Sequence, residues 1–264
     1  MRRENCPEEE TITDLKKKLR HTSDDLDRCK KDKDEFIFLA AHELKAPLRK
    51  VSTFTERLVG KAGNQLDEEV LGYINRIEKN VLLMQSLIDD LSDLSEISAN
   101  IQLEKCDLNT LMSDVLRELE VKKNKIKVDL SELPEVNGNG QQLKKAFKNI
   151  IGNAIKFQRE GVQAEIIIRS ESLDGKDKSL LNLPGENEYW KISIEDNGIG
   201  FPGEEKDEIL KPFVKLNAQS SYPGNGLGLA VCDKIMKIHK GEFYAMGEED
   251  KGSVFVLILP KFLQ

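Results

Sequence analysis

His42 and Glu43 are the first residues along the chain whose types and spacing suit a reaction. They lie in the segment FIFLAAHELKAPL (36–48), where Pro47 falls inside an otherwise continuous helical pattern. A proline there removes its own amide donor and frees the carbonyl of Glu43, so we expect the helix to bend one turn beyond the histidine. A carboxylate that accepts from the Nδ1–H group of an imidazole makes Nε2 a better nucleophile. The pair predicts a nucleophilic histidine, and the alternative is an ordinary pair of solvated side chains.

A second candidate site is one face of a helix predicted over 139–157. Asn149, Asn153 and Lys156 follow one another at steps of four and three, which places them on the same side of a helix. An amide oxygen can bind Mg²⁺, and an ammonium group can bind a phosphate oxygen. The face therefore suits a magnesium-phosphate group, and the alternative is a polar surface exposed to water.

Two glycine-containing segments add further candidates. Asp196 ends a predicted strand and is followed by Gly198 and Gly200, which allow a ligand to approach the backbone closely. Residues 224–229 (GNGLGL) open a predicted helix, and the free amides and positive dipole end of a helix attract phosphate. This segment lacks both the βαβ setting of a dinucleotide-binding motif and the GK[ST] ending of a Walker loop. It predicts an anion site of another kind.

Two kinds of structure must position these residues. Apolar positions recur at steps of three and four from Ile12 to Phe36, as in a coiled-coil seam; a single amphipathic helix against a globular body is the alternative. Two wider stripes, over 44–58 and 70–91, are separated by glycines and an asparagine and predict an antiparallel helical hairpin. Because both helices have broad apolar faces, we expect two copies to form a four-helix bundle, which makes the protein a homodimer.

After residue 100 the pattern changes to short strands mixed with helices, which indicates an α+β fold and a domain boundary near residue 101. The expected strands lie near 102–106, 125–130, 163–171, 188–195, 242–247 and 252–259, and the expected helices near 108–120, 139–157 and 226–239. The segment 172–187 is expected to be a long hairpin tip, and the sequence assigns it no role.

Composition excludes several other classes of protein. The net charge of −7 argues against a general nucleic-acid binder. No run approaches the ~18 apolar residues that a membrane span requires. The four cysteines are too scattered for a zinc site or a disulfide framework. We therefore expect a soluble protein of the reducing cytoplasm.

Taken together, the motifs resemble those of the histidine protein kinases of two-component signalling. In chain order they are similar to that family's phosphoacceptor, asparagine, first glycine, phenylalanine and second glycine boxes, at residues 36–48, 149–157, 196–200, 210–213 and 224–229. The resemblance implies a coiled-coil signalling helix (1–34), a dimerisation and histidine phosphotransfer hairpin (35–100), and an α+β sandwich ATP-binding domain (101–264). It also implies ATP and Mg²⁺ as cofactors.

The resemblance further implies a role for each site residue. His42 would receive the γ-phosphoryl group of ATP on Nε2, with Glu43 assisting as base, and Asn153 would hold Mg²⁺. Asp196 would accept from the adenine amino group, and 214–223 would form a mobile lid. The residues assigned to the nucleotide are Asn149, Asn153, Lys156, Asp196, Gly198, Gly200, Phe213, Gly224, Gly226, Leu227 and Gly228.

The implied function is autophosphorylation of His42 followed by transfer to an aspartate of a response regulator receiver domain, under an upstream sensor domain or sensor protein. Asn149 stands where gyrase and chaperone ATPases of the same superfamily carry a glutamate that activates water, so hydrolysis is disfavoured. Ala46 stands where such kinases usually carry Thr or Asn to place a water, which predicts weak phosphatase activity. The alternative function is a catalytically silent dimeric scaffold or a histidine phosphotransfer protein.

Overall fold

The computed structural model describes residues 7–62, 66–97, 102–123, 125–174, 178, 181, 183, 187–216 and 225–262. The chain divides into two compact units, Met1–Glu78 and Lys79–Gln264. Within the described residues, no helix combines the length and the apolar character that would let it cross a membrane.

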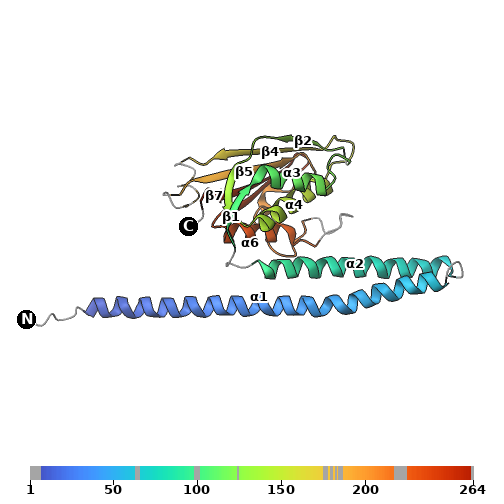
Figure 1. The fold of residues 1–264 in the computed structure, drawn as a ribbon, viewed down its shortest axis with the longest axis horizontal. Helices are drawn as coiled ribbons and strands as arrows, with labels where there is room; N and C mark the ends of the chain where they lie inside the picture. The colour runs from blue at the N-terminus through green and yellow to red at the C-terminus, as the bar shows by residue number, and fades with distance from the viewer. Residues whose placement is uncertain are drawn as a thin grey trace, which may run out of the picture. The chain divides into compact units, whose positions relative to one another are not determined.

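Two long helices form the predicted hairpin, α1 (Pro7–Ala62) and α2 (Glu68–Glu96) (Figure 1). Helix α1 continues through Pro47, and Figure 1 shows it curving over its C-terminal part, as expected for a helix that contains a proline. The carboxylate of Asp67 accepts from the amide of Val70 at 2.7 Å and so caps the start of α2. Of the predicted coiled-coil seam, only the side chains of Thr22 and Lys33 lie within the described residues, and both are exposed.

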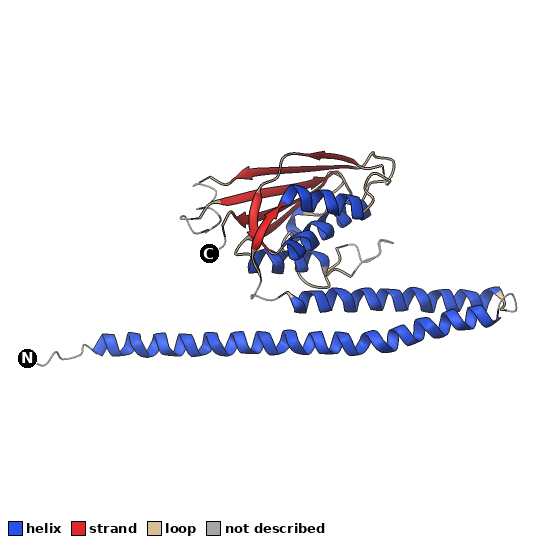
Figure 2. Ribbon diagram, viewed as in Figure 1, coloured by secondary structure: helices blue, strands red, loops and turns tan. Residues whose placement is uncertain are grey.

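The second unit contains a five-stranded sheet in the order β2-β4-β5-β7-β6. Its strands are β2 (Lys127–Leu130), β4 (Glu165–Ser172), β5 (Tyr189–Asp196), β6 (Glu242–Glu248) and β7 (Gly252–Pro260). β2 runs parallel to β4, and the other neighbours are antiparallel. Three helices cover one face of the sheet (Figure 2): α3 (Leu108–Glu118), α4 (Gly140–Lys156) and α6 (Gly228–Ile238).

A separate two-stranded sheet pairs β1 (Glu104–Asp107) with β3 (Glu135–Gly138). The six predicted strands are confirmed to within two residues at each end, but β3 was not predicted. Its four residues include one apolar side chain, Val136, which is buried. A strand that short offers no alternation from which to recognise it.

Helices α4 and α6 supply the core and hold the glycine segments. Asn139 caps α4 by accepting from the amide of Gln142 at 3.0 Å. Helix α6 begins at Gly228, two residues later than predicted, because Gly226 has φ +68° and cannot belong to a right-handed helix. A short 3-10 turn, η2 (Gly203–Glu205), follows the first glycine segment.

Buried His239 joins the end of α6 to the start of α4. Its Nε2 accepts from the amide of Asn139 at 3.0 Å, so the proton lies on Nδ1, which donates to the carbonyl of Ile235 at 2.8 Å. Burial lowers the pKa of this imidazole, because the charged form cannot be hydrated. His239 is therefore a structural residue of the α4–α6 contact.

Candidate nucleotide-binding site

One cavity of about 340 Å³ gathers residues from three of the predicted motifs. Helix α4 supplies one wall, the end of β5 and its following loop supply a second, and the start of α6 supplies a third. The predicted site residues that line it are Asn149, Asn153, Lys156, Asp196, Gly200, Gly226 and Gly228. A volume of this size falls within the range of small-ligand sites.

The other predicted residues lie elsewhere. Gly198 adjoins Asp196 without lining the cavity, and the side chain of Leu227 is fully buried. Phe213 is 59% exposed. Gly224 and most of the predicted lid lie outside the described residues. His42 and Glu43 belong to the first unit.

Asp196 is the buried carboxylate of the cavity, with 8% of its surface exposed. Its Oδ1 accepts from the amide of Gly198 at 2.9 Å. Burial raises the pKa of this carboxyl to about 6, although hydrogen bonds from the Gly198 and Ser253 amides favour the ionised form. A buried acceptor of this kind suits a ligand that donates a hydrogen bond, such as the amino group of an aromatic base.

The backbone around Asp196 leaves no room for a side chain at Gly198. A Cβ there would lie 2.4 Å from the carbonyl oxygen of Phe157 and 2.7 Å from Oδ1 of Asp196. The glycine is required because the loop passes directly against the end of α4. This close packing fixes the direction of the Asp196 carboxylate.

Three lysines line the cavity, Lys148, Lys156 and Lys215. Lys148 pairs with Glu118 at 3.4 Å, whereas Lys156 and Lys215 lie close enough to interact with each other. Burial, and then the like charge of Lys215, lower the pKa of Lys156. Two neighbouring ammonium groups in one cavity favour an anion between them, and a phosphate chain meets that need. Lys215 was missed from the sequence because it lies two residues after Phe213, in the segment assigned as a whole to the lid.

Asn149 connects the two walls of the cavity. Its Nδ2 donates to the carbonyl of Gly228 at 3.0 Å, which ties α4 to the first residue of α6. The second glycine segment is also held by the backbone of Phe213, whose amide donates to the carbonyl of Gly226 at 2.9 Å. A Cβ on Gly226 would lie 2.5 Å from the carbonyl oxygen of Val214, so the two segments pack backbone against backbone.

A second cavity, of about 590 Å³, lies near Trp190 and residues 132–137. Its two lysines are neutralised by neighbours: Lys105 pairs with Glu135 at 2.5 Å and Lys261 pairs with Glu188 at 2.9 Å. It contains none of the predicted site residues. The smaller cavity, with its buried carboxylate and two neighbouring lysines, is therefore the candidate site.

The side chains of His42 and Glu43 are both exposed to solvent. That of His42 is 74% exposed, that of Glu43 is 86% exposed, and Nδ1 of His42 lies 4.0 Å from Oε1 of Glu43. This separation exceeds a hydrogen bond, and both side chains are free of packing that would hold them apart. The neighbouring Ala41 is fully buried, so the helix presents the imidazole to solvent from a packed turn.

Comparison with known proteins assigns both halves of the chain. Residues 32–100 match the family model of the His Kinase A (phospho-acceptor) domain. Residues 138–262 match that of the histidine kinase-, DNA gyrase B- and HSP90-like ATPase. Together the two models span most of the chain and include every predicted motif.

Individual relatives agree with these matches. The chain is 29% identical over 245 residues to cyanobacterial phytochrome A of Nostoc sp.. This alignment covers 92% of this chain and 30% of the relative. The chain is 30% identical over 229 residues to the adaptive-response sensory kinase SasA of Prochlorococcus marinus, covering 84% of this chain and 57% of the relative. The chain thus spans less than two thirds of the length of these proteins.

Among solved structures, full-length ShkA in complex with AMPPNP superposes with a TM-score of 0.62 at 23% identity, over 86% of this chain and 45% of that one. The Acinetobacter baumannii histidine kinase AdeS superposes with a TM-score of 0.53 at 22% identity, over 83% and 98%. These likenesses establish the fold. The two family models and the named kinase relative show that this chain carries the phosphoacceptor and ATPase domains of the two-component sensor histidine kinases and belongs to that family.

Proposed function

We propose that the chain is a histidine autokinase that transfers the γ-phosphoryl group of ATP to Nε2 of His42 and passes it on to an aspartate of a response regulator. One observation carries this proposal. A single cavity combines a buried carboxylate, an asparagine-lysine helix face and glycine backbone, while the chain also carries an exposed histidine beside a carboxylate.

Each part of the cavity has a place in this proposal. Asp196 accepts from the adenine amino group, and Gly198 and Gly200 form the floor under the base. Asn149, Lys156 and Lys215 line the phosphates, as do Gly226 and Gly228. The backbone amide of Phe213 holds the second glycine segment through its hydrogen bond to Gly226. The buried side chain of Leu227 anchors the same segment in the core. The volume of about 340 Å³ supports a ligand of nucleotide size.

The proposed phosphoryl transfer forms one bond and breaks one bond. The Nε2 lone pair forms the new N–P bond, and the bond between the γ-phosphorus and the bridging oxygen breaks, with its electron pair leaving on ADP. Glu43 accepts the hydrogen bond of Nδ1–H and stabilises the positive charge that develops on the ring. Asn149, an amide in place of a carboxylate, cannot deprotonate water, so transfer to the ring is favoured over hydrolysis.

Asn153 is the proposed ligand for Mg²⁺. Within the residues that the structure describes, no three His, Cys, Asp or Glu side chains gather to hold a metal ion. A site with one amide oxygen suits Mg²⁺ bound mainly through nucleotide phosphates and water. The ion, when bound, would neutralise charge on the phosphates, and Asn153 would orient it.

A homodimer follows from the exposed apolar residues of the hairpin. On α2, positions 74, 81 and 88 are buried at 6%, 3% and 8% exposure, but Val70, Ile77 and Met84 remain 37%, 45% and 41% exposed. On α1, Leu44, Val51 and Leu58 remain 51%, 40% and 49% exposed. A second copy would cover both sets and complete a four-helix bundle.

We also propose weak phosphatase activity, because exposed Ala46 offers no hydrogen bond to a water one turn after His42. Positioning of that kind commonly contributes ~10²-fold or more in rate. Ala46→Thr should therefore raise dephosphorylation of the partner regulator while changing autophosphorylation much less. Equal phosphatase rates in the two proteins would show that another group positions the water.

The second candidate function, a silent scaffold or phosphotransfer protein, needs no nucleotide site. The retained carboxylate and the paired lysines of the cavity favour the enzyme.

We further propose a cytoplasmic location under an upstream sensor, which is supported by the free, buried Cys106 and Cys232. The test of the function is incubation with labelled ATP and Mg²⁺, which should yield an acid-labile, alkali-stable phosphate. Absence of any label would favour the silent scaffold.

A further inference from the structure

The loop from Asn197 to Gly200 is held by backbone hydrogen bonds to two other segments of the second unit. The amide of Ile199 donates to the carbonyl of Phe157 at 2.9 Å, and its carbonyl accepts from the amide of Asp250 at 2.8 Å. At Gly200, where φ is +64°, a Cβ would lie 1.9 Å from the carbonyl oxygen of Glu248. The loop is therefore enclosed between the end of α4 and the turn that joins β6 to β7.

Arg159 joins all three of these segments. It lies two residues after the C-cap of α4, and its Nε donates to the carbonyl of Asn197 at 2.8 Å. Its Nη1 donates to the carbonyl of Asp250, a residue with φ +60° at the tip of the β6–β7 turn. A planar guanidinium can make both bonds at once in fixed directions, whereas the ammonium of a lysine is a point charge on a flexible stem.

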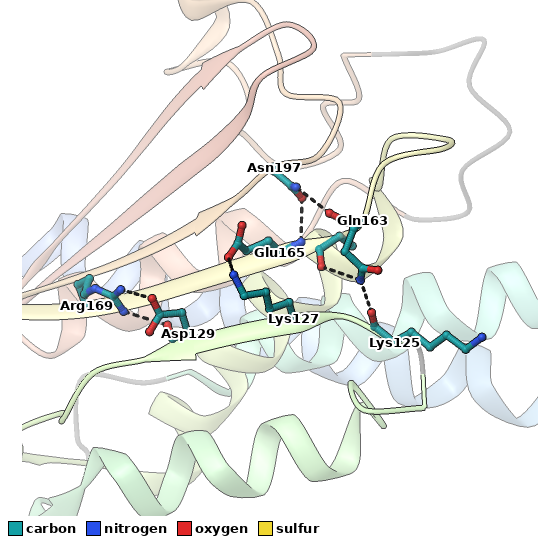
Figure 3. Close-up of polar contacts among 8 residues, drawn as sticks. Lys125, Lys127, Asp129, Gln163, Glu165, Arg169 and Asn197 are labelled. Atoms are coloured by element: carbon teal, nitrogen blue, oxygen red, sulfur yellow. Dashed lines mark hydrogen bonds and ion pairs between the residues drawn. The ribbon is translucent and has the colours of Figure 1, made fainter.

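The side chain of Asn197 anchors the loop on the other side. Figure 3 shows it reaching the start of β4, where Oδ1 accepts from the amide of Glu165 and Nδ2 donates to the carbonyl of Gln163, both at 2.9 Å. Neither Arg159 nor Asn197 lines the cavity. Both hold the peptide that follows Asp196.

We propose that Arg159 is a positioning residue for base recognition: its guanidinium fixes the Asn197 carbonyl to the β6–β7 turn and thereby holds the Asp196–Gly200 loop in the form that recognises adenine. The inference rests on the proposed function, because it takes the loop to be the floor of the adenine site. Without the two bonds the loop occupies its binding form for a smaller fraction of the time. The apparent dissociation constant then rises by the inverse of that fraction.

The test uses Arg159→Lys and Arg159→Gln in the full chain, with Mg²⁺-ATP and Mg²⁺-GTP as probes. Guanine carries an oxygen at C6, where adenine has the amino group that Asp196 would accept from, so only ATP gains affinity from this contact with the carboxylate. We expect the dissociation constant for ATP to rise about tenfold in both variants and that for GTP to change little, so that the preference for ATP narrows. At saturating ATP the labelling rate should stay within about twofold, because the phosphate end is unaltered.

Arg169→Gln is the matched control. Arg169 on β4 donates to the carbonyl of Asp129 on β2 at 3.0 Å and also pairs with the carboxylate of Asp129 (Figure 3). Neither residue lines the cavity. The Arg169→Gln variant should lower the midpoint temperature of unfolding without changing the ratio of the dissociation constants for ATP and GTP.

The possible failures are distinguishable. Unchanged ATP affinity in folded Arg159 variants, or an equal loss for ATP and GTP, overturns the positioning role alone. If Arg159→Gln does not fold, the ATP-to-GTP ratio of Arg159→Lys decides. If the unaltered protein binds no ATP, the proposed function is wrong and this inference is wrong with it.

Discussion

The helical hairpin (α1 and α2) and the sheet with its covering helices, here called the ATP-binding unit, differ in how much of their apolar surface is buried in a single copy of the chain. In the second unit, helices α3, α4 and α6 cover the sheet, and side chains such as Leu143, Phe147 and Ile150 are fully buried. In the hairpin, Leu44, Leu58 and Ile77 remain about half exposed. The sheet and its helices therefore have a complete core in one copy, whereas the described part of the hairpin keeps apolar residues exposed that the proposed dimer would cover. The exposed His42 lies on the incomplete element, and the buried Asp196 lies in the complete one.

Matched leucine truncations test this contrast most strongly. Leu143→Ala should lower the free energy of unfolding by about 2–5 kcal/mol, because it leaves a cavity in a closed core. Leu44→Ala should cost much less in dilute protein, and its cost should grow with protein concentration as the dimer forms. Urea unfolding at two protein concentrations measures both. A concentration-dependent effect of Leu143→Ala, with none for Leu44→Ala, would reverse the comparison.

Charges on the exposed stripe should separate the copies. Leu44→Lys combined with Leu58→Lys places like charges across the proposed dimer interface and should weaken association at least about 100-fold. Light scattering at micromolar concentration should report a dimer for the unaltered chain and a monomer for the variant, with ATP affinity unchanged. A monomeric unaltered chain would remove the four-helix-bundle proposal.

These contrasts also explain what sequence could and could not predict. The spacing of Asn149, Asn153 and Lys156 placed all three on one helix face, because helical periodicity is local. Likewise, Asp196 was identified from its position between a strand and two glycines. Lys215 and Arg159 were not, because their roles depend on contacts with segments distant in the chain.

Asp196→Asn should separate binding from stability. The pKa of about 6 in the folded protein lies above the ordinary aspartate value of about 3.9, so the folded state binds the proton more tightly. The unfolding free energy should therefore fall as the pH rises from about 4 to about 6. At pH 7 the Asn variant should be more stable by roughly 1–2 kcal/mol, while losing ATP affinity.

Thermal unfolding and nucleotide titration of the same samples measure both effects. A variant that is less stable at pH 7 would mean that the carboxylate stabilises the fold and is not held in place for a ligand.

His239 should give a smaller effect of opposite sign. Burial lowers the pKa of its imidazole, so its contribution to stability is complete above the unfolded value of about 6.5 and is lost as the pH falls. Protonation would also remove the Nε2 acceptor of the Asn139 amide. The stability advantage of the unaltered protein over His239→Gln should shrink between pH 7.5 and pH 5.5. Because both proteins keep Asp196, their difference isolates the histidine, and a constant difference would contradict the assignment.

The proposed reaction carries phosphate from ATP held in the cavity of the second unit to the exposed ring of His42. Its most direct test is labelling with γ-labelled ATP and Mg²⁺, in parallel with nucleotide binding, for the unaltered chain, His42→Gln and Asn153→Asp. We expect acid-labile, alkali-stable label on the unaltered chain alone. His42→Gln should bind nucleotide with unchanged affinity, and Asn153→Asp should lose Mg²⁺-dependent binding. Label that persists on His42→Gln would place the acceptor elsewhere and contradict the proposed transfer to His42.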